Sequence, residues 1–187
     1  FRPRALEMHI IAVIPALVAF VIGVKKGFIR AYMDVYLPAI LLLPDYFTTK
    51  IVPGIPPLSF NQSAILPCAL LFFLFNDRKW KFSFTDVLVV GYVCAVTYSE
   101  YINVDYKEAQ NLCFLLVTTA LLPYILTKGI VEPYGMREAF AKRLAILFTI
   151  CAATLTYETR MGKPLIRIFL DRFFPGQGYW VTTFRWG

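Results

Sequence analysis

The sequence predicts an all-α, polytopic integral membrane protein, a bundle of kinked helices with an added interfacial helix. Of its 187 residues, 58% are hydrophobic and only 17% are charged, which is too little polar surface for a soluble domain of this length. The net charge of +7 is carried mainly by short segments between long apolar runs, as topology signals are. We therefore expect the lipid bilayer as the main partner and no nucleic acid.

Six apolar segments are predicted as membrane helices. They cover residues 8–24, 31–43, 58–75, 87–102, 109–126 and 140–157. A full crossing takes about 20 residues, so segment 31–43 spans only if Phe28 and Ile29 join it, and otherwise it is tilted or re-entrant. Six crossings are expected, or five if that segment does not span.

Proline and glycine mark special positions inside these segments. Prolines interrupt four of them, at positions 15, 38, 67 and 123. Each proline frees a backbone carbonyl and tends to kink its helix, which predicts either ordinary bundle kinks or a cleft surrounded by kinked helices. Gly91 and Ala95 form one small-xxx-small face, where a second helix is expected to approach closely.

Lysines and arginines in the short loops predict the orientation of the bundle. The loops after the first, third and fifth segments carry ten of them, whereas the loops after the second and fourth carry only Lys50 and Lys107. The positive-inside rule places the ten-residue set in the cytoplasm, although Arg2 and Arg4 oppose this assignment. The expected organisation is a transmembrane bundle over residues 1–157 and an extracytoplasmic basic and aromatic segment over 158–187.

The segment 158–187 is predicted to contain an amphipathic helix on the membrane surface. Pro164 suits the first turn of this helix, and Pro175-Gly176 suits its end. Its polar stripe consists of Arg160, Lys163, Arg167 and Asp171. The aromatic residues that follow predict either an interfacial belt or a site for a lipid-linked sugar, in which arginines clamp a diphosphate.

Asp34 is the one carboxylate well inside an apolar run, and intramembrane acids are costly and often functional. Arg30 lies one helical turn earlier, so a structural Arg30–Asp34 pair is one interpretation. A proton- or substrate-handling role is the other. His9 is the only histidine, so a bis-His haem or histidine-rich metal centre is excluded. It is interpreted either as an interfacial residue beside Glu7 or as a single ligand of a haem or a chlorophyll-type magnesium, and the first interpretation is preferred. Neither a metal nor another cofactor is predicted.

Four stretches resemble the N-terminal portion of bacterial O-antigen ligase/polymerase-like membrane proteins. They are residues 35–47 (VYLPAILLLPDYF), 82–86 (FSFTD), 172–179 (RFFPGQGY) and 184–187 (FRWG). The resemblance implies a multi-helix glycosyltransferase in the bacterial inner membrane. Such an enzyme transfers or polymerises a glycan carried on undecaprenyl diphosphate, on the extracytoplasmic side, without a nucleotide sugar or an essential metal.

The resemblance assigns only Arg172 and Arg185, as contacts to the carrier diphosphate. Family members continue past the position of Gly187 with a large loop that carries functional Arg and His residues, so no catalytic residue is assigned and the chain is expected to be a fragment or a truncated relative. A second hypothesis is a non-catalytic subunit that packs against other membrane subunits of a pigment–protein or respiratory assembly. A third is a transporter that uses Asp34 as its coupling acid.

Overall fold

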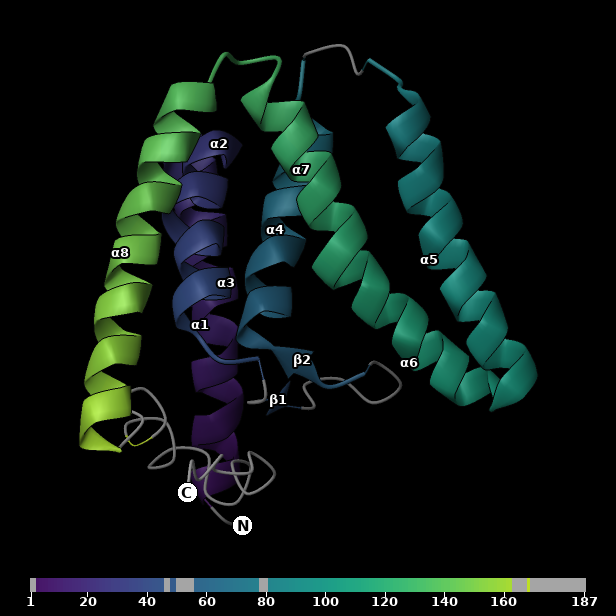
Figure 1. Ribbon diagram of the computed structural model, residues 1–187, viewed down its shortest axis with the longest axis horizontal. Helices are drawn as coiled ribbons and strands as arrows, with labels where there is room; N and C mark the ends of the chain where they lie inside the picture. Colours follow the sequence, from purple (N-terminus) through teal and green to yellow (C-terminus); the bar gives the residue numbers. More distant parts are fainter. Residues whose placement is uncertain (1–2, 46–47, 50–55, 78–80, 163–167, 169–187) are drawn as a thin grey trace.

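The computed structural model describes residues 3–45, 48–49, 56–77, 81–162 and 168. Within them the chain forms six continuous helical rods (Figure 1). The rods are α1 (Pro3–Lys26); α2 (Phe28–Ala31) with the π-turn η1 (Tyr32–Tyr36) and α3 (Leu37–Leu42); α4 (Phe60–Phe75); α5 (Phe84–Asn103); α6 (Tyr106–Leu116) with the π-turn η2 (Val117–Leu121) and α7 (Leu122–Val131); and α8 (Arg137–Met161). A two-residue antiparallel pair, β1 (Thr48–Thr49) with β2 (Leu58–Ser59), precedes α4.

The predicted all-α class is confirmed, and each apolar segment is a helix. The second rod begins at Phe28, so Phe28 and Ile29 do join segment 31–43. Two rods are long and apolar enough to cross a membrane, Tyr106–Val131 and Arg137–Met161. Helix α4 is apolar but shorter, with 16 residues. Length and composition thus give two candidate membrane spans among the described residues.

Successive rods run in opposite directions, so the links between them alternate between two ends of the molecule (Figure 1). The basic end, at the top of Figure 1, holds the links α1–α2, α4–α5 and α7–α8. Its basic residues are Lys25, Lys26, Arg30, Lys81, Lys128, Arg137, Lys142 and Arg143. The opposite end, which we call the amide end, holds the β1–β2 pair, the start of α4 and the α5–α6 link.

Both π-turns lie directly before a Leu-Pro pair. Tyr32–Tyr36 precedes Leu37-Pro38, and Val117–Leu121 precedes Leu122-Pro123. A proline ring crowds the carbonyl four residues earlier, and in both rods that carbonyl lies inside the widened turn. A π-turn is one way to accommodate this crowding without ending the helix. Pro15 and Pro67, by contrast, lie inside α-helices.

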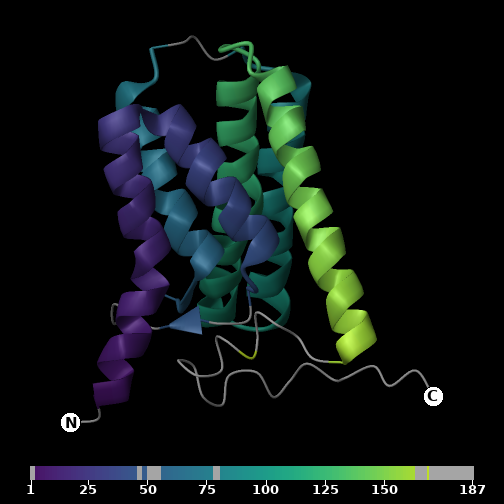
Figure 2. The same ribbon diagram turned by 90° about the vertical axis from the view of Figure 1, so that its left-hand side faces the viewer.

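The core lies where the second rod crosses obliquely between α1 and α8 and packs on α4 (Figure 2). Its largest fully buried side chains are Tyr32, Tyr36, Ile65, Cys68, Leu71, Leu126 and Ile130. Close approach of α1 and α4 occurs at Gly23, where an added Cβ would collide with the Leu71 side chain. An added Cβ on Gly91 meets only open space, so the predicted close contact at Gly91 is absent among the described residues.

Most residues of helix α5 are exposed. It packs mainly on α6 and η2 and meets α7 through Asp86, and only Asp86 and Val93 of its residues are buried. Its exposed large apolar side chains are Phe84, Val87, Leu88, Val90, Tyr92, Tyr98, Tyr101 and Ile102. The described part of the chain therefore leaves a broad apolar face of α5 uncovered, as expected for a surface that faces lipid or another helix.

Candidate functional site

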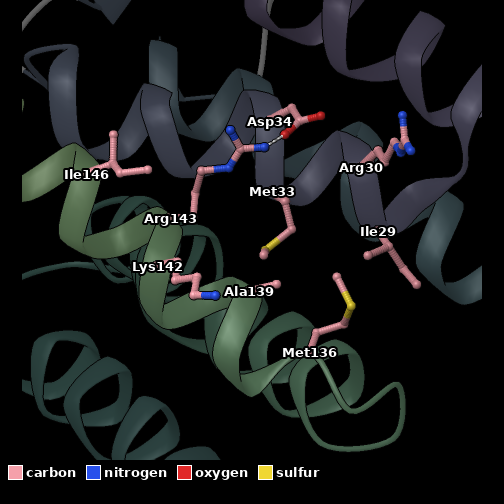
Figure 3. A pocket seen from close by; sticks show the side chains of 9 residues that line it. All are labelled: Ile29, Arg30, Met33, Asp34, Met136, Ala139, Lys142, Arg143 and Ile146. Carbon is pink, nitrogen blue, oxygen red and sulfur yellow. Dashed lines mark hydrogen bonds and ion pairs between the residues drawn. The ribbon is translucent and has the colours of Figure 1, made fainter.

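Asp34 pairs with Arg143 of α8, which corrects the predicted pair with Arg30 (Figure 3). Arg30 and Asp34 share the second rod, but the Arg30 guanidinium points away from the carboxylate (Figure 3). The two paired side chains are 37% (Asp34) and 43% (Arg143) exposed. The pair thus links two rods through a partly open contact, and the sequence missed it because the partners lie far apart in the chain.

The other predicted contacts lie outside the described residues. Arg172 and Arg185 belong to that part of the chain, and so does most of the predicted surface helix. The side chain of His9 in α1 is likewise outside the description. Helix α8 itself continues through Arg160 and ends at Met161. The next residue, Gly162, adopts the left-handed conformation with φ 61° that favours glycine at a helix end.

A second acid, Asp86, forms the most buried ion pair among the described residues. Lys128 Nζ lies 2.6 Å from Asp86 Oδ1 and 2.7 Å from Oδ2, and it also donates to Ser83 Oγ at 2.8 Å. Tyr124 donates its hydroxyl hydrogen to Asp86 Oδ1 at 2.6 Å. The two charged side chains are only 7% (Asp86) and 15% (Lys128) exposed. Close pairing offsets the cost of removing both charges from water.

The Asp86 network holds the start of α5 against α7. Asp86 also accepts the backbone N–H of Ser83 at 2.7 Å and completes a capping box. This ion pair was not predicted from the sequence, because Asp86 lies at the edge of an apolar segment and Lys128 was interpreted as a charged residue of a loop. All the polar groups named here are mutually satisfied, which indicates a structural clamp rather than a site that awaits a ligand.

A third polar cluster lies where α4 begins, at the amide end. It contains the neutral residues Ser59, Asn61, Gln62 and Thr118 around the acid Asp45. Ser59 Oγ donates to Asp45 Oδ1 at 3.3 Å, and Asn61 Nδ2 donates to the same oxygen. Gln62 Nε2 donates to Thr118 Oγ1 of η2 at 3.2 Å. This amide cluster joins the end of the second rod, α4 and the fifth rod.

Local sequence explains why the cluster forms. Ser59 and Gln62 make a reciprocal capping box, in which Ser59 N donates to Gln62 Oε1 at 2.9 Å and Gln62 N donates to Ser59 Oγ at 3.4 Å. This cap fixes the first turn of α4. The turn places Asn61, which is 4% exposed, beside Asp45.

Asn61 Oδ1 is the unusual atom of the amide cluster. It is buried and has no hydrogen-bond partner among the described residues. A buried acceptor without a donor costs roughly 1–3 kcal/mol, so such an atom needs an explanation. Carboxylate, amide and hydroxyl groups together can both accept from and donate to the hydroxyls of a polyol. No group of three or more His, Cys, Asp or Glu side chains suited to a metal occurs within the described ranges.

Comparisons with protein-family models, curated proteins and solved structures gave no match. The resemblance to O-antigen ligase-like proteins therefore stays a prediction from the quoted motifs. Two of these motifs contain a residue of the polar clusters described above. Residues 82–86 end at the clamp acid Asp86, and residues 35–47 contain Asp45 of the amide cluster.

Proposed function

We propose that this chain is the N-terminal part, or a truncated relative, of an O-antigen ligase-like glycosyltransferase with six membrane crossings. In this proposal the amide cluster contacts the glycan of an undecaprenyl-diphosphate-linked donor. The observation that carries the proposal is the buried acceptor Asn61 Oδ1, which lacks a donor among the described residues. A sugar hydroxyl is a donor of the required kind.

The orientation of the bundle supports this choice of end. By the positive-inside rule the basic end faces the cytoplasm, and the amide end then faces outward. Glycan transfer by the proteins that this chain resembles takes place on the outward side. Helix α8 also ends on the side of the amide cluster (Figure 1), so the chain enters the basic segment with Arg172 and Arg185 from there.

The proposed reaction is displacement at the anomeric carbon of the donor sugar. An acceptor hydroxyl attacks that carbon to form the new glycosidic bond and loses its proton to solvent, while the bond to the carrier diphosphate breaks and the diphosphate leaves with the electron pair. Arg172 and Arg185 would stabilise the leaving charge with paired donors. The amide cluster would orient the sugar, so that it contributes to positioning rather than to bond breaking.

The test is glycan transfer by the intact protein in native membranes. Asn61→Ala should lower transfer about tenfold or more, the effect of about 1.4 kcal/mol, with an unchanged amount of protein in the membrane. The matched control is Asn103→Ala, because Asn103 is an exposed residue of the same type near the same end, and within the described ranges its side chain hydrogen-bonds only to Ser99. If Asn61→Ala and Asn103→Ala transfer glycan equally well, the amide cluster does not contact the substrate. If Arg172→Ala and Arg185→Ala transfer glycan normally, these arginines do not contact the diphosphate.

The uncovered face of α5 favours a second candidate, a non-catalytic subunit of a larger membrane complex. Gly91 lies in open space within α5, so Gly91→Leu should leave this chain folded and yet block a closely packed partner helix. A stoichiometric partner that co-purifies with the wild type and is lost from Gly91→Leu would support this candidate. Gly91→Ala, which adds only a methyl group in the same open space, is the matched control.

A further inference from the structure

A pocket of about 430 Å³ lies between the second rod and α8 near the basic end. Its cationic lining residues are Arg30, Lys142 and Arg143, and Asp34 is its acid (Figure 3). The remaining lining is mainly apolar, from Ile29, Met33, Met136, Ala139 and Ile146. Charged groups therefore lie beside an apolar surface, which suits a ligand that has an anionic head and a hydrocarbon body.

The basic side chains at this pocket outnumber the acidic ones. Lys142 Nζ lies 2.8 Å from Glu138 Oε1, and Arg143 pairs with Asp34. Three cations thus face two carboxylates, and one positive charge remains in excess. A phosphodiester carries one negative charge and would balance this excess.

Arg143 has donors for both Asp34 and a ligand. A guanidinium has five N–H donors in a fixed fork, and the pair with Asp34 uses one terminal nitrogen of the group. Asp34 then acts as a positioning residue that holds Arg143 at the pocket. Arg30 and Lys142, both exposed, can turn toward the same anion.

We propose that this pocket binds the phosphodiester of an anionic membrane lipid, with the acyl chains against Ile29, Met33 and Ile146. Basic pockets between membrane helices on the cytoplasmic side are suited to such headgroups. The inference requires that the bundle lie in a membrane. It does not depend on glycan transfer, and it concerns the opposite end of the molecule.

The test uses the purified full chain in a zwitterionic detergent and measures lipid binding by the shift in thermal unfolding. Short-chain phosphatidylglycerol should stabilise the wild type, whereas phosphatidylcholine with the same chains should have a much smaller effect. The double variant Arg30→Gln/Lys142→Gln should bind phosphatidylglycerol about tenfold more weakly, the change expected for about 1.4 kcal/mol. The control Lys25→Gln/Arg137→Gln removes two exposed basic-end charges outside the pocket and should bind like the wild type.

Three outcomes would overturn the inference. Equal stabilisation by both lipids would show that the headgroup is not recognised. Equal weakening in the two double variants would show a diffuse charge effect rather than a pocket. Stabilisation by inorganic phosphate or glycerol phosphate as strong as that by phosphatidylglycerol would assign the site to a soluble anion. Because the substituted side chains are exposed, all four substitutions should leave folding unchanged.

Discussion

The two ends of the bundle pair their polar side chains in different ways. At the basic end, acidic side chains form ion pairs with basic ones, namely Asp86 with Lys128 and Asp34 with Arg143. At the amide end, one acid is held by neutral amide and hydroxyl groups, and Asn61 Oδ1 remains without a donor in the described chain. Ion pairs fix helices in one arrangement, whereas an unsatisfied neutral acceptor can meet a ligand. We therefore interpret the ion pairs of the basic end as structural, and we propose that the substrate contacts the amide end.

The largest expected effect comes from breaking the clamp at the basic end. Asp86→Ala leaves the Lys128 ammonium, whose side chain is 15% exposed, without this carboxylate, and it should lower the stability of the protein more than any other substitution proposed here. Thermal unfolding in detergent measures this loss. The double variant Asp86→Leu/Lys128→Met should recover much of it, since both charges are then removed. A loss below about 1 kcal/mol in Asp86→Ala would contradict the structural role of the pair.

The next largest loss of stability is expected from disturbing the close packing of α1 against α4 at Gly23. Gly23→Ala forces the end of the buried Leu71 side chain to move; such overpacking costs up to about 1–3 kcal/mol, from which a gain in helix propensity of about 1 kcal/mol is subtracted. Gly91→Ala adds the same methyl group in open space and should be neutral or slightly stabilising, because alanine favours a helix over glycine. Equal unfolding temperatures for the two variants would contradict the close approach of α1 and α4.

A smaller effect is expected within the amide end. The hydrogen bond from Gln62 Nε2 to Thr118 Oγ1 should contribute about 0.5–1.5 kcal/mol. A double-mutant cycle with Gln62→Leu and Thr118→Val isolates this term, because it separates the pair from the loss of the Gln62 cap. A coupling energy indistinguishable from zero would mean that this bond does not join α4 to η2.

The smallest expected effect belongs to Asp34. Asp34→Asn removes a pair whose members are 37% and 43% exposed, so solvent screening limits the loss to about 0–1 kcal/mol. Unfolding in detergent should therefore change much less than in Asp86→Ala. If the two variants lose equal stability, the distinction between a buried clamp and a partly open pair fails.

The sequence predicted the helices better than it predicted the contacts between them. Long apolar runs located all six rods, and Phe28 extended the second rod as its length required. Side-chain partners depend on which rods become neighbours, a long-range property that spacing along the chain does not encode. Asp34 was thus paired with Arg30 on its own helix, although its partner lies on α8.

Three further features could not be predicted from the sequence. Asp86 lies at a segment edge, where an acid usually reads as solvated, and only the approach of α7 buries it. The close contact of two helices was expected at Gly91 but occurs at Gly23, since a small residue permits close approach without specifying a partner. The amide cluster was not predicted from the sequence, because polar residues such as Asn61 and Gln62 are common in the first turn of a helix.

The most direct test of the account is photo-crosslinking of the intact protein in native membranes. A diazirine side chain replaces the exposed Pro57, beside the amide cluster, or Ala139, in the pocket at the basic end. We predict that the carrier-linked glycan crosslinks at position 57 and not at position 139, and that crosslinking at position 57 falls sharply in Asn61→Ala but not in Asn103→Ala. Glycan crosslinked at position 139, or equally in both asparagine variants, would contradict the assignment of substrate contact to the amide end.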